Sequence, residues 1–216
     1  MFKLKIGFLL DKNNNWIIHD IKKFVNKLNK EKFITKISYN YKKFLNFDIL
    51  FILNYTKIID SKVLEKIRLP IVIHASDLPR GKGFAPLIWQ VLENEKNIKV
   101  TMIKAVKKVD SGPVILKDTL KLNGTELYEE LRKKLSNIII RLINKLLINY
   151  PNIKFIPQKG NSTFYKKRTP ENSKININKS IKSQFNLLRT SNNEKWPAFF
   201  YFKKKKYIIK IIKNEI

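Results

Sequence analysis

The sequence contains no cysteine and only two histidines among its 216 residues. The absence of cysteine excludes disulfide frameworks, thiolate nucleophiles and cysteine-ligated metal sites. With so few histidines a metal site built from imidazoles is not expected either, so we predict a protein without a metal cofactor. No apolar run reaches the length of a membrane-spanning helix, and residues 1–6 alternate like a strand. We therefore expect a cytoplasmic protein.

Acidic residues are scarce, with 17 Asp and Glu against 45 Lys and Arg, which gives a formal net charge of +28. Such a charge suits binding to nucleic acid. However, the lysines are scattered over every segment, and lysine, asparagine and isoleucine are enriched together, as AT-rich codon usage produces. A nucleic-acid surface needs basic residues that cluster with aromatic side chains. We therefore expect no nucleic-acid partner, although the same charge attracts a polyanionic small substrate.

Hydrophobic patterning predicts an α/β fold. Residues 49–53 form a continuous apolar run, which is typical of a parallel strand that is buried on both faces. Helical periodicity alternates with such strands and predicts a Rossmann-like, doubly wound, mostly parallel sheet. The expected strands cover 3–10, 33–39, 48–53, 70–74, 98–106 and 114–120, and the expected helices cover 16–28, 61–66 and 126–148, the last capped by Thr125.

The remaining residues have a different sequence pattern, with shorter and more irregular predicted elements than the first part of the chain. We expect residues 1–150 to form the main domain and residues 151–216 to form a small α+β accessory subdomain. Within the second segment, the pattern predicts an amphipathic helix over 179–189 and a hairpin that joins 198–202 to 207–212.

One stretch, residues 71–90, carries most of the candidate chemistry. A β-branched run ends on His74, a loop rich in Pro and Gly follows, and Pro86 opens a short helix. Loops after parallel strands converge, so Asp110 can meet His74 and prepare it as a general base. The alternatives are a buried core histidine and an aspartate that only forms a turn. The residues alone thus indicate proton transfer by an Asp–His pair in the crevice at the strand ends of an α/β fold.

Two motifs resemble the formyltetrahydrofolate-dependent formyltransferases. Residues 74–83, HASDLPRGKG, are similar to the signature His-x-Ser-x-Leu-Pro-x-x-x-Gly, and residues 109–115, VDSGPVI, resemble the Asp-x-Gly-x-Ile segment. Further along, Gln158, residues 163–171 and residues 186–189 resemble the segment that follows the catalytic domain in sugar N-formyltransferases and methionyl-tRNA formyltransferases. The resemblance covers nearly the whole chain and is weakest over residues 11–45.

This resemblance implies transfer of a formyl group from N10-formyltetrahydrofolate to an amine. An Asn, a His and an Asp act together in the family, so His74 is expected to take the amine proton and Asp110 to hold His74. The family Asn lies two residues before the His, where this chain has Val72, which cannot donate a hydrogen bond. Asn54, at the end of a neighbouring strand, is our expected replacement, and its alternative role is to start a turn.

The resemblance also assigns binding residues. For the folate we expect contacts from Tyr55, Lys57, Ile59, Lys107 and Val109. For the acceptor substrate we expect contacts from Ser76, Lys82, Lys167, Arg168, Phe185, Arg189 and Trp196. For the aromatic residues in this second set, the alternative role is packing within the core of the accessory subdomain.

The resemblance favours a nucleotide-linked amino sugar as acceptor, namely a UDP-4-amino-4,6-dideoxyhexose used in bacterial surface polysaccharide biosynthesis. A methionyl-tRNA formyltransferase continues into a larger C-terminal barrel, for which too few residues remain in this chain. The alternatives are formyl transfer to methionyl-tRNA or glycinamide ribonucleotide, or a basic, nucleic-acid-binding homologue without activity. A homodimer is also expected as an assembly.

Overall fold

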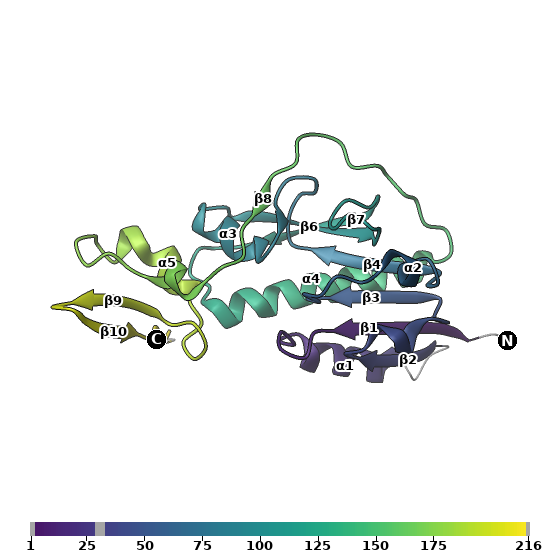
Figure 1. Cartoon of the computed structure of the whole chain (residues 1–216), viewed down its shortest axis with the longest axis horizontal. Helices are drawn as coiled ribbons and strands as arrows, with labels where there is room; N and C mark the ends of the chain where they lie inside the picture. Colours follow the sequence, from purple (N-terminus) through teal and green to yellow (C-terminus); the bar gives the residue numbers. More distant parts are fainter. Residues whose placement is uncertain (1–2, 29–32, 215–216) are drawn as a thin grey trace.

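A computed structural model describes residues 3–28 and 33–214. Its centre is a six-stranded sheet in the order β2-β1-β3-β4-β6-β7 (Figure 1). Neighbouring strands from β2 to β4 are parallel, and β6 and β7 run antiparallel to their neighbours, so the mostly parallel Rossmann-like class is confirmed. The strands are β1 (Leu4–Leu10), β2 (Phe33–Ser38), β3 (Ile49–Leu53), β4 (Leu69–His74), β6 (Asn97–Lys104) and β7 (Val114–Lys121).

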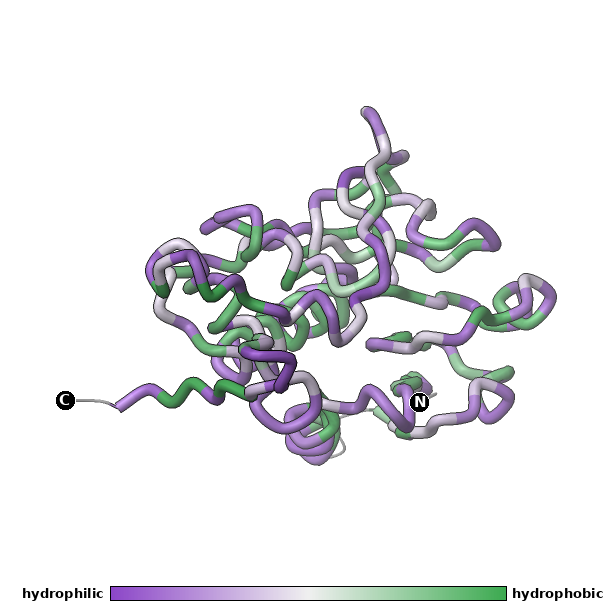
Figure 2. The backbone as a smooth tube through the Cα atoms, turned by 60° about the vertical axis from the view of Figure 1, so that its left-hand side comes forward, coloured by the Kyte–Doolittle hydropathy of each residue, from purple (hydrophilic) through white to green (hydrophobic). Residues whose placement is uncertain are grey.

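Helices α1 (Ile18–Leu28), α3 (Pro86–Leu92) and α4 (Tyr128–Asn149) bury their apolar side chains in one large cluster with the sheet. In α1 the buried residues are Ile21, Phe24, Val25 and Leu28, which recur at helical spacing and form one apolar stripe. Figure 2 shows that the hydrophobic parts of the chain gather in the interior, whereas hydrophilic residues occupy most of the loops. In the part of the chain that is described, no helix is long and apolar enough to cross a membrane.

The opposite face of the sheet is covered only by short elements. The 3-10 turn η1 (Tyr41–Phe44) and helix α2 (Ser61–Leu64) pack on Leu9, Leu50 and Ile52. Val72 shares this face, and its side chain is partly exposed although β4 lies in the middle of the sheet. Because a central strand normally buries its side chains, the exposure of Val72 marks an opening on this face.

After α4 the chain crosses back over the molecule in an extended segment (Figure 1). It ends in β8 (Phe164–Tyr165), which pairs with β5 (Lys82–Gly83) in the loop after β4. Neither two-residue strand is predictable from a hydrophobic pattern, since both are too short to show alternation. The remaining elements are η2 (Pro170–Ser173), η3 (Lys182–Gln184), α5 (Phe185–Arg189), β9 (Ala198–Phe202) and β10 (Lys205–Ile209).

Two sequence-based expectations about helices are wrong in detail. Helix α4 begins at Tyr128 with Leu127 at its N-cap, because Glu126 accepts hydrogen bonds from the backbone N–H groups of Asn123 and Gly124 and holds them in a turn. The amphipathic helix predicted over 179–189 is reduced to η3 and α5. There the side chain of Gln184 bonds to backbone groups of residues 176–180, and such bonds compete with a helix. The hairpin is confirmed, with β9 as predicted, but its second strand β10 covers Lys205–Ile209 and not 207–212.

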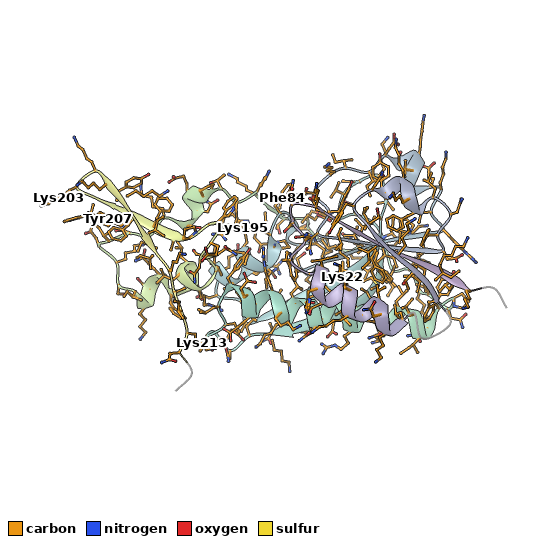
Figure 3. The ribbon with its side chains drawn as sticks, turned by 90° about the horizontal axis from the view of Figure 1, so that it is seen from below. Lys22, Phe84, Lys195, Lys203, Tyr207 and Lys213 are labelled. Atoms are coloured by element: carbon orange, nitrogen blue, oxygen red, sulfur yellow. The ribbon has the colours of Figure 1, made fainter. Side chains whose placement is uncertain are left out.

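Lysines are spread over the molecule, as the sequence indicated. Figure 3 shows Lys22, Lys195, Lys203 and Lys213 on widely separated parts of the structure. Such a distribution gives the whole molecule a positive field, which attracts anions without specifying where they bind.

Glu126 ties the start of α4 to α5. Its buried carboxylate accepts from Lys134 and from two backbone N–H groups, and it lies 3.6 Å from the guanidinium of Arg189. Burial raises the pKa of this carboxyl, but the hydrogen bonds from Lys134 and the backbone outweigh burial and lower the pKa from 4.5 to about 2. A carboxyl with a depressed pKa stabilises the fold above its unfolded pKa, and this contribution is lost as the pH falls through the folded value.

We therefore expect Glu126→Gln to lower the free energy of unfolding at neutral pH by about 2–3 kcal/mol. Wild-type stability should fall between pH 4.5 and about 2, and the variant should show a shallower dependence over this range. Urea denaturation at several pH values measures both effects. Equal pH dependence in the two proteins would show that protonation of Glu126 does not cause the loss of stability at low pH.

Candidate functional site

His74 lies at the end of β4, where its ring is buried between two oxygen acceptors. Nδ1 lies 3.7 Å from Oδ1 of Asp110, and Nε2 lies 2.8 Å from the carbonyl oxygen of Gly81. Both side chains of the His–Asp pair are about nine-tenths buried. The predicted meeting of His74 and Asp110 is therefore present in the structure, although the two residues are far apart in sequence.

The loop that carries Asp110 is held by several polar contacts. The other carboxylate oxygen of Asp110 accepts from the backbone N–H of Gly83 at 3.0 Å. The side-chain amide of Gln158 donates to the carbonyls of Asp110 and Gly112 at 3.0 and 2.8 Å. A Cβ on Gly112 would lie 1.7 Å from the carbonyl oxygen of Lys104, so only glycine fits there. These contacts fix the direction of the Asp110 carboxylate.

The paired strands β5 and β8 fix the other side of His74. The N–H of Gly81 donates to Oγ1 of Thr163, and the N–H of Lys82 donates to the carbonyl of Thr163. Trp89 donates through Nε1 to the carbonyl of Lys166, and its ring stacks on Tyr165. The extended segment from α4 to β8 thereby anchors the loop whose Gly81 carbonyl contacts the imidazole.

Asn54 follows the last residue of β3, and β3 pairs with β4, the strand that ends on His74. The register pairs Ile52 with Val72, so Asn54 and His74 each lie two residues beyond a paired position on neighbouring strands. Its φ of +53° is a left-handed conformation that asparagine tolerates better than most residues. Its side-chain amide nitrogen is buried and has no hydrogen-bond partner among the residues described. A buried donor without a partner is costly and indicates a place for a ligand oxygen.

Asp11 supports the turn that contains Asn54, a role that the sequence did not suggest. Its buried carboxylate accepts from the N–H and Oγ1 of Thr56, and the hydrogen bond from the Thr56 side chain lowers the pKa of Asp11. Its position at the end of β1, directly before a run of turn-forming residues, is the only sequence signal of this role.

An apolar wall of three partly exposed side chains lies on the open face of the sheet, close in sequence to His74 and Asn54. Val72, Tyr55 and Ile59 are partly exposed and pack on the small cluster below the open face. A partly exposed apolar wall next to an unpartnered amide fits a flat ligand that carries one hydrogen-bond acceptor.

The other expected folate contacts are on the surface. Lys57, Lys107 and Val109 are exposed, and they lie on the loops that follow β3 and β6. Their exposure leaves them available to a ligand, in contrast to the buried His74–Asp110 pair.

Some of the residues expected to contact the acceptor are buried or bonded within the protein, and others are exposed to solvent. Lys82 is buried and donates from Nζ to Oγ of Ser111, and the hydroxyl of Ser76 is buried without a partner in the described structure. Lys167 and Trp196 are exposed, and Phe185 and Arg168 are partly buried. Arg189 is buried against Glu126 and Asn186, so its charge serves the fold and it offers no free face to a substrate phosphate.

Comparisons with known proteins agree with the motifs. The sequence profile of the family described as formyl transferase matches residues 13–144. The methionyl-tRNA formyltransferase of Thermodesulfovibrio yellowstonii is 32% identical over 198 residues, which cover 88% of this chain and 60% of that relative. The chain thus spans less than two thirds of the length of this relative.

Solved structures share the fold. A methionyl-tRNA formyltransferase from Clostridium thermocellum superposes with a TM-score of 0.82 at 24% identity, covering 100% of this chain and 94% of that chain. A 4-N formyltransferase from Francisella tularensis gives a TM-score of 0.70 at 17% identity, with 99% of both chains covered. Together with the family profile, which spans more than half of the sequence, these findings place the protein: the chain belongs to the formyl transferase family.

Proposed function

We propose that this chain transfers the formyl group of N10-formyltetrahydrofolate to a primary amine, with methionyl-tRNA as the favoured acceptor. The observation that carries the proposal is the buried His74–Asp110 pair beside the unpartnered amide of Asn54. General base catalysis needs a proton acceptor, and formyl transfer also needs a donor at the oxygen where negative charge develops. These three side chains supply both.

In this proposal the amine nitrogen bonds to the formyl carbon, and His74 takes the proton that the nitrogen loses on Nδ1, because Nε2 keeps its own proton to donate to the carbonyl of Gly81. Negative charge then develops on the formyl oxygen, where the amide of Asn54 and the protonated imidazole stabilise it. Asp110 balances the charge of the imidazolium at 3.7 Å. When the bond from the formyl carbon to N10 breaks, the proton passes to the folate nitrogen. The acceptor leaves as a formamide.

The choice of acceptor rests on the relatives. The sequence suggested an amino sugar nucleotide and no nucleic-acid partner, whereas several relatives above 30% identity are named methionyl-tRNA formyltransferases. Their names support the tRNA alternative better than the sugar. An amino sugar nucleotide remains the second candidate, because residues 74–83, followed by Trp89 and Gln90, resemble the motif of enzymes that act on UDP-linked 4-amino-4,6-dideoxy sugars.

The test is an acceptor panel with N10-formyltetrahydrofolate as donor. Methionyl-tRNA, a UDP-4-amino-4,6-dideoxyhexose and glycinamide ribonucleotide are incubated separately with the protein, and mass spectrometry follows the gain of one formyl group. We expect methionyl-tRNA to be modified. Modification of the sugar nucleotide alone would show that it is the acceptor in place of methionyl-tRNA, and the proposed formyl transfer would stand. No modification of any amine would contradict the proposed function.

A further inference from the structure

Two arginines next to the start of α4 have no acidic partner. Among the described residues, neither Arg132 nor Arg168 forms an ion pair with a carboxylate. Burial lowers the pKa of both guanidinium groups. Removing a cation from water without a counter-charge costs free energy, so a protein rarely keeps a buried guanidinium group without a compensating anion.

Both arginines interact with Tyr128. The guanidinium carbon of Arg132 lies 4.1 Å from the centre of the Tyr128 ring and 5.4 Å from the centre of the Trp16 ring. Arg168 interacts with Tyr128 electrostatically. The two aromatic rings hold the guanidinium of Arg132 in one orientation, as a preorganised binding group requires.

Arg168 has an unused donor. Its Nη2 donates to the carbonyl of Asn172 at 3.1 Å, but its Nε is buried and has no partner within the described structure. Glu129 is the acid that acts on Arg132, but it is an exposed residue on the first turn of α4. Guanidinium groups bind phosphate oxygens through two parallel hydrogen bonds, and free donors on a fixed arginine are suited to this geometry.

The location connects this cluster to the reaction site. Trp16 belongs to the loop after β1, and that loop contacts the Asn54 turn, since Asn14 donates to the carbonyl of Asn54 at 3.4 Å. Figure 1 shows that β1, β3 and β4 end toward the side of the molecule where α4 begins. A molecule bound at the two arginines can therefore extend toward the strand ends that carry His74.

We propose that Arg132 and Arg168, which both interact with Tyr128, bind a phosphate group of the acceptor substrate and orient its amine toward His74. The inference rests on the proposed formyl transfer and names the chemistry shared by both candidate acceptors, a phosphate ester. In an amino sugar nucleotide this is the diphosphate, and in methionyl-tRNA it is a phosphodiester near the charged end.

The first experiment measures anion binding without formyl transfer. The melting temperature of the full chain is recorded with inorganic pyrophosphate, with UDP and with uncharged tRNA. We expect pyrophosphate to stabilise the wild type, and Arg132→Gln and Arg168→Gln to lose this stabilisation. Arg141→Gln is the matched control, because Arg141 also lies on α4 but is paired with Asp118. Equal stabilisation of all four proteins by pyrophosphate would overturn the proposal.

The second experiment measures turnover of the acceptor that the panel identifies. Loss of one charge-assisted contact should raise KM about tenfold or more with little change in kcat. Arg132→Lys and Arg168→Lys should recover part of the loss, because lysine keeps the charge without the paired geometry. Unchanged KM in both Gln variants of an active enzyme would overturn the phosphate site and leave formyl transfer intact.

The two measurements separate the two hypotheses. Arginine-dependent binding of pyrophosphate without formylation of any amine would support the phosphate site and contradict formyl transfer. Comparison of UDP with uncharged tRNA shows which kind of phosphate the site binds. Arginine-dependent stabilisation by UDP supports the nucleotide diphosphate, and arginine-dependent stabilisation by uncharged tRNA supports the phosphodiester.

Discussion

Replacement of His74 by glutamine should lower the rate of formyl transfer by about 10²–10⁴-fold, the usual contribution of a general base. Glutamine can still donate a hydrogen bond to the carbonyl of Gly81, which now lies 2.8 Å from Nε2. It cannot take up the proton that the attacking amine loses. The expected result is therefore a folded protein with a near-normal melting temperature and very low turnover.

The chain contains a matched control for this variant. His19 is the only other histidine, and it is exposed on α1. His19→Gln should leave kcat and KM unchanged. If His74→Gln kept most of the wild-type rate under saturating donor and acceptor, His74 would not be the base, and the His–Asp pair would have only a structural role.

Replacement of Asn54 should have the second-largest effect, a fall in kcat of about 10²–10³-fold, as expected for the loss of one oxyanion donor. Asn54→Gly suits the φ of +53° and removes the amide, so the backbone stays in place. Asn54→Asp keeps the shape of the side chain but places an acceptor where a donor is needed. Both variants should be slow while their melting temperatures stay near that of the wild type.

Asn94 provides the control for backbone conformation, since it also has a positive φ, of +66°. Asn94→Gly should retain normal turnover. A rescue variant tests the position of the donor directly. Val72 occupies the place of the family Asn, so Val72→Asn in the Asn54→Gly background should restore part of the rate. Unchanged kcat in Asn54→Gly would remove Asn54 from the mechanism.

The main architecture could be predicted because it depends on long hydrophobic patterns. The buried run in β3 and the apolar stripe of α1 specify a parallel strand and an amphipathic helix without knowledge of their neighbours. The end of α4 near Pro151 was equally visible, since proline cannot continue a helix. The predicted helix over 179–189 is only partly present, because Ile181 is exposed and only the short helix α5 buries an apolar side chain, that of Leu188.

The candidate site could be predicted only in part. His74 and Asp110 stand in recognisable motifs, and topology brings the ends of their strands together. The supports of this pair are contacts to backbone atoms, such as those of Gln158 and Gly83, and these leave almost no pattern in a sequence. Arg132 was missed for a different reason. It looks like any surface arginine on a helix until the structure shows its two aromatic neighbours and, among the described residues, no ion pair with a carboxylate.

Arg189 illustrates the opposite error. As a basic residue in a matching segment it suggested a phosphate contact, but its burial against Glu126 shows that its charge is used by the fold. Charge alone therefore does not distinguish a binding arginine from a structural one. The distinction depends on whether an acidic side chain lies within reach.

A single-turnover reaction with a carbon isotope in the formyl group of N10-formyltetrahydrofolate tests whether His74, Asp110 and Asn54 transfer that group to an amine. We expect the label to appear on the acceptor amine with the wild type and to be nearly absent with His74→Gln. Equal labelling by both proteins, or labelling by neither, would contradict the proposed transfer.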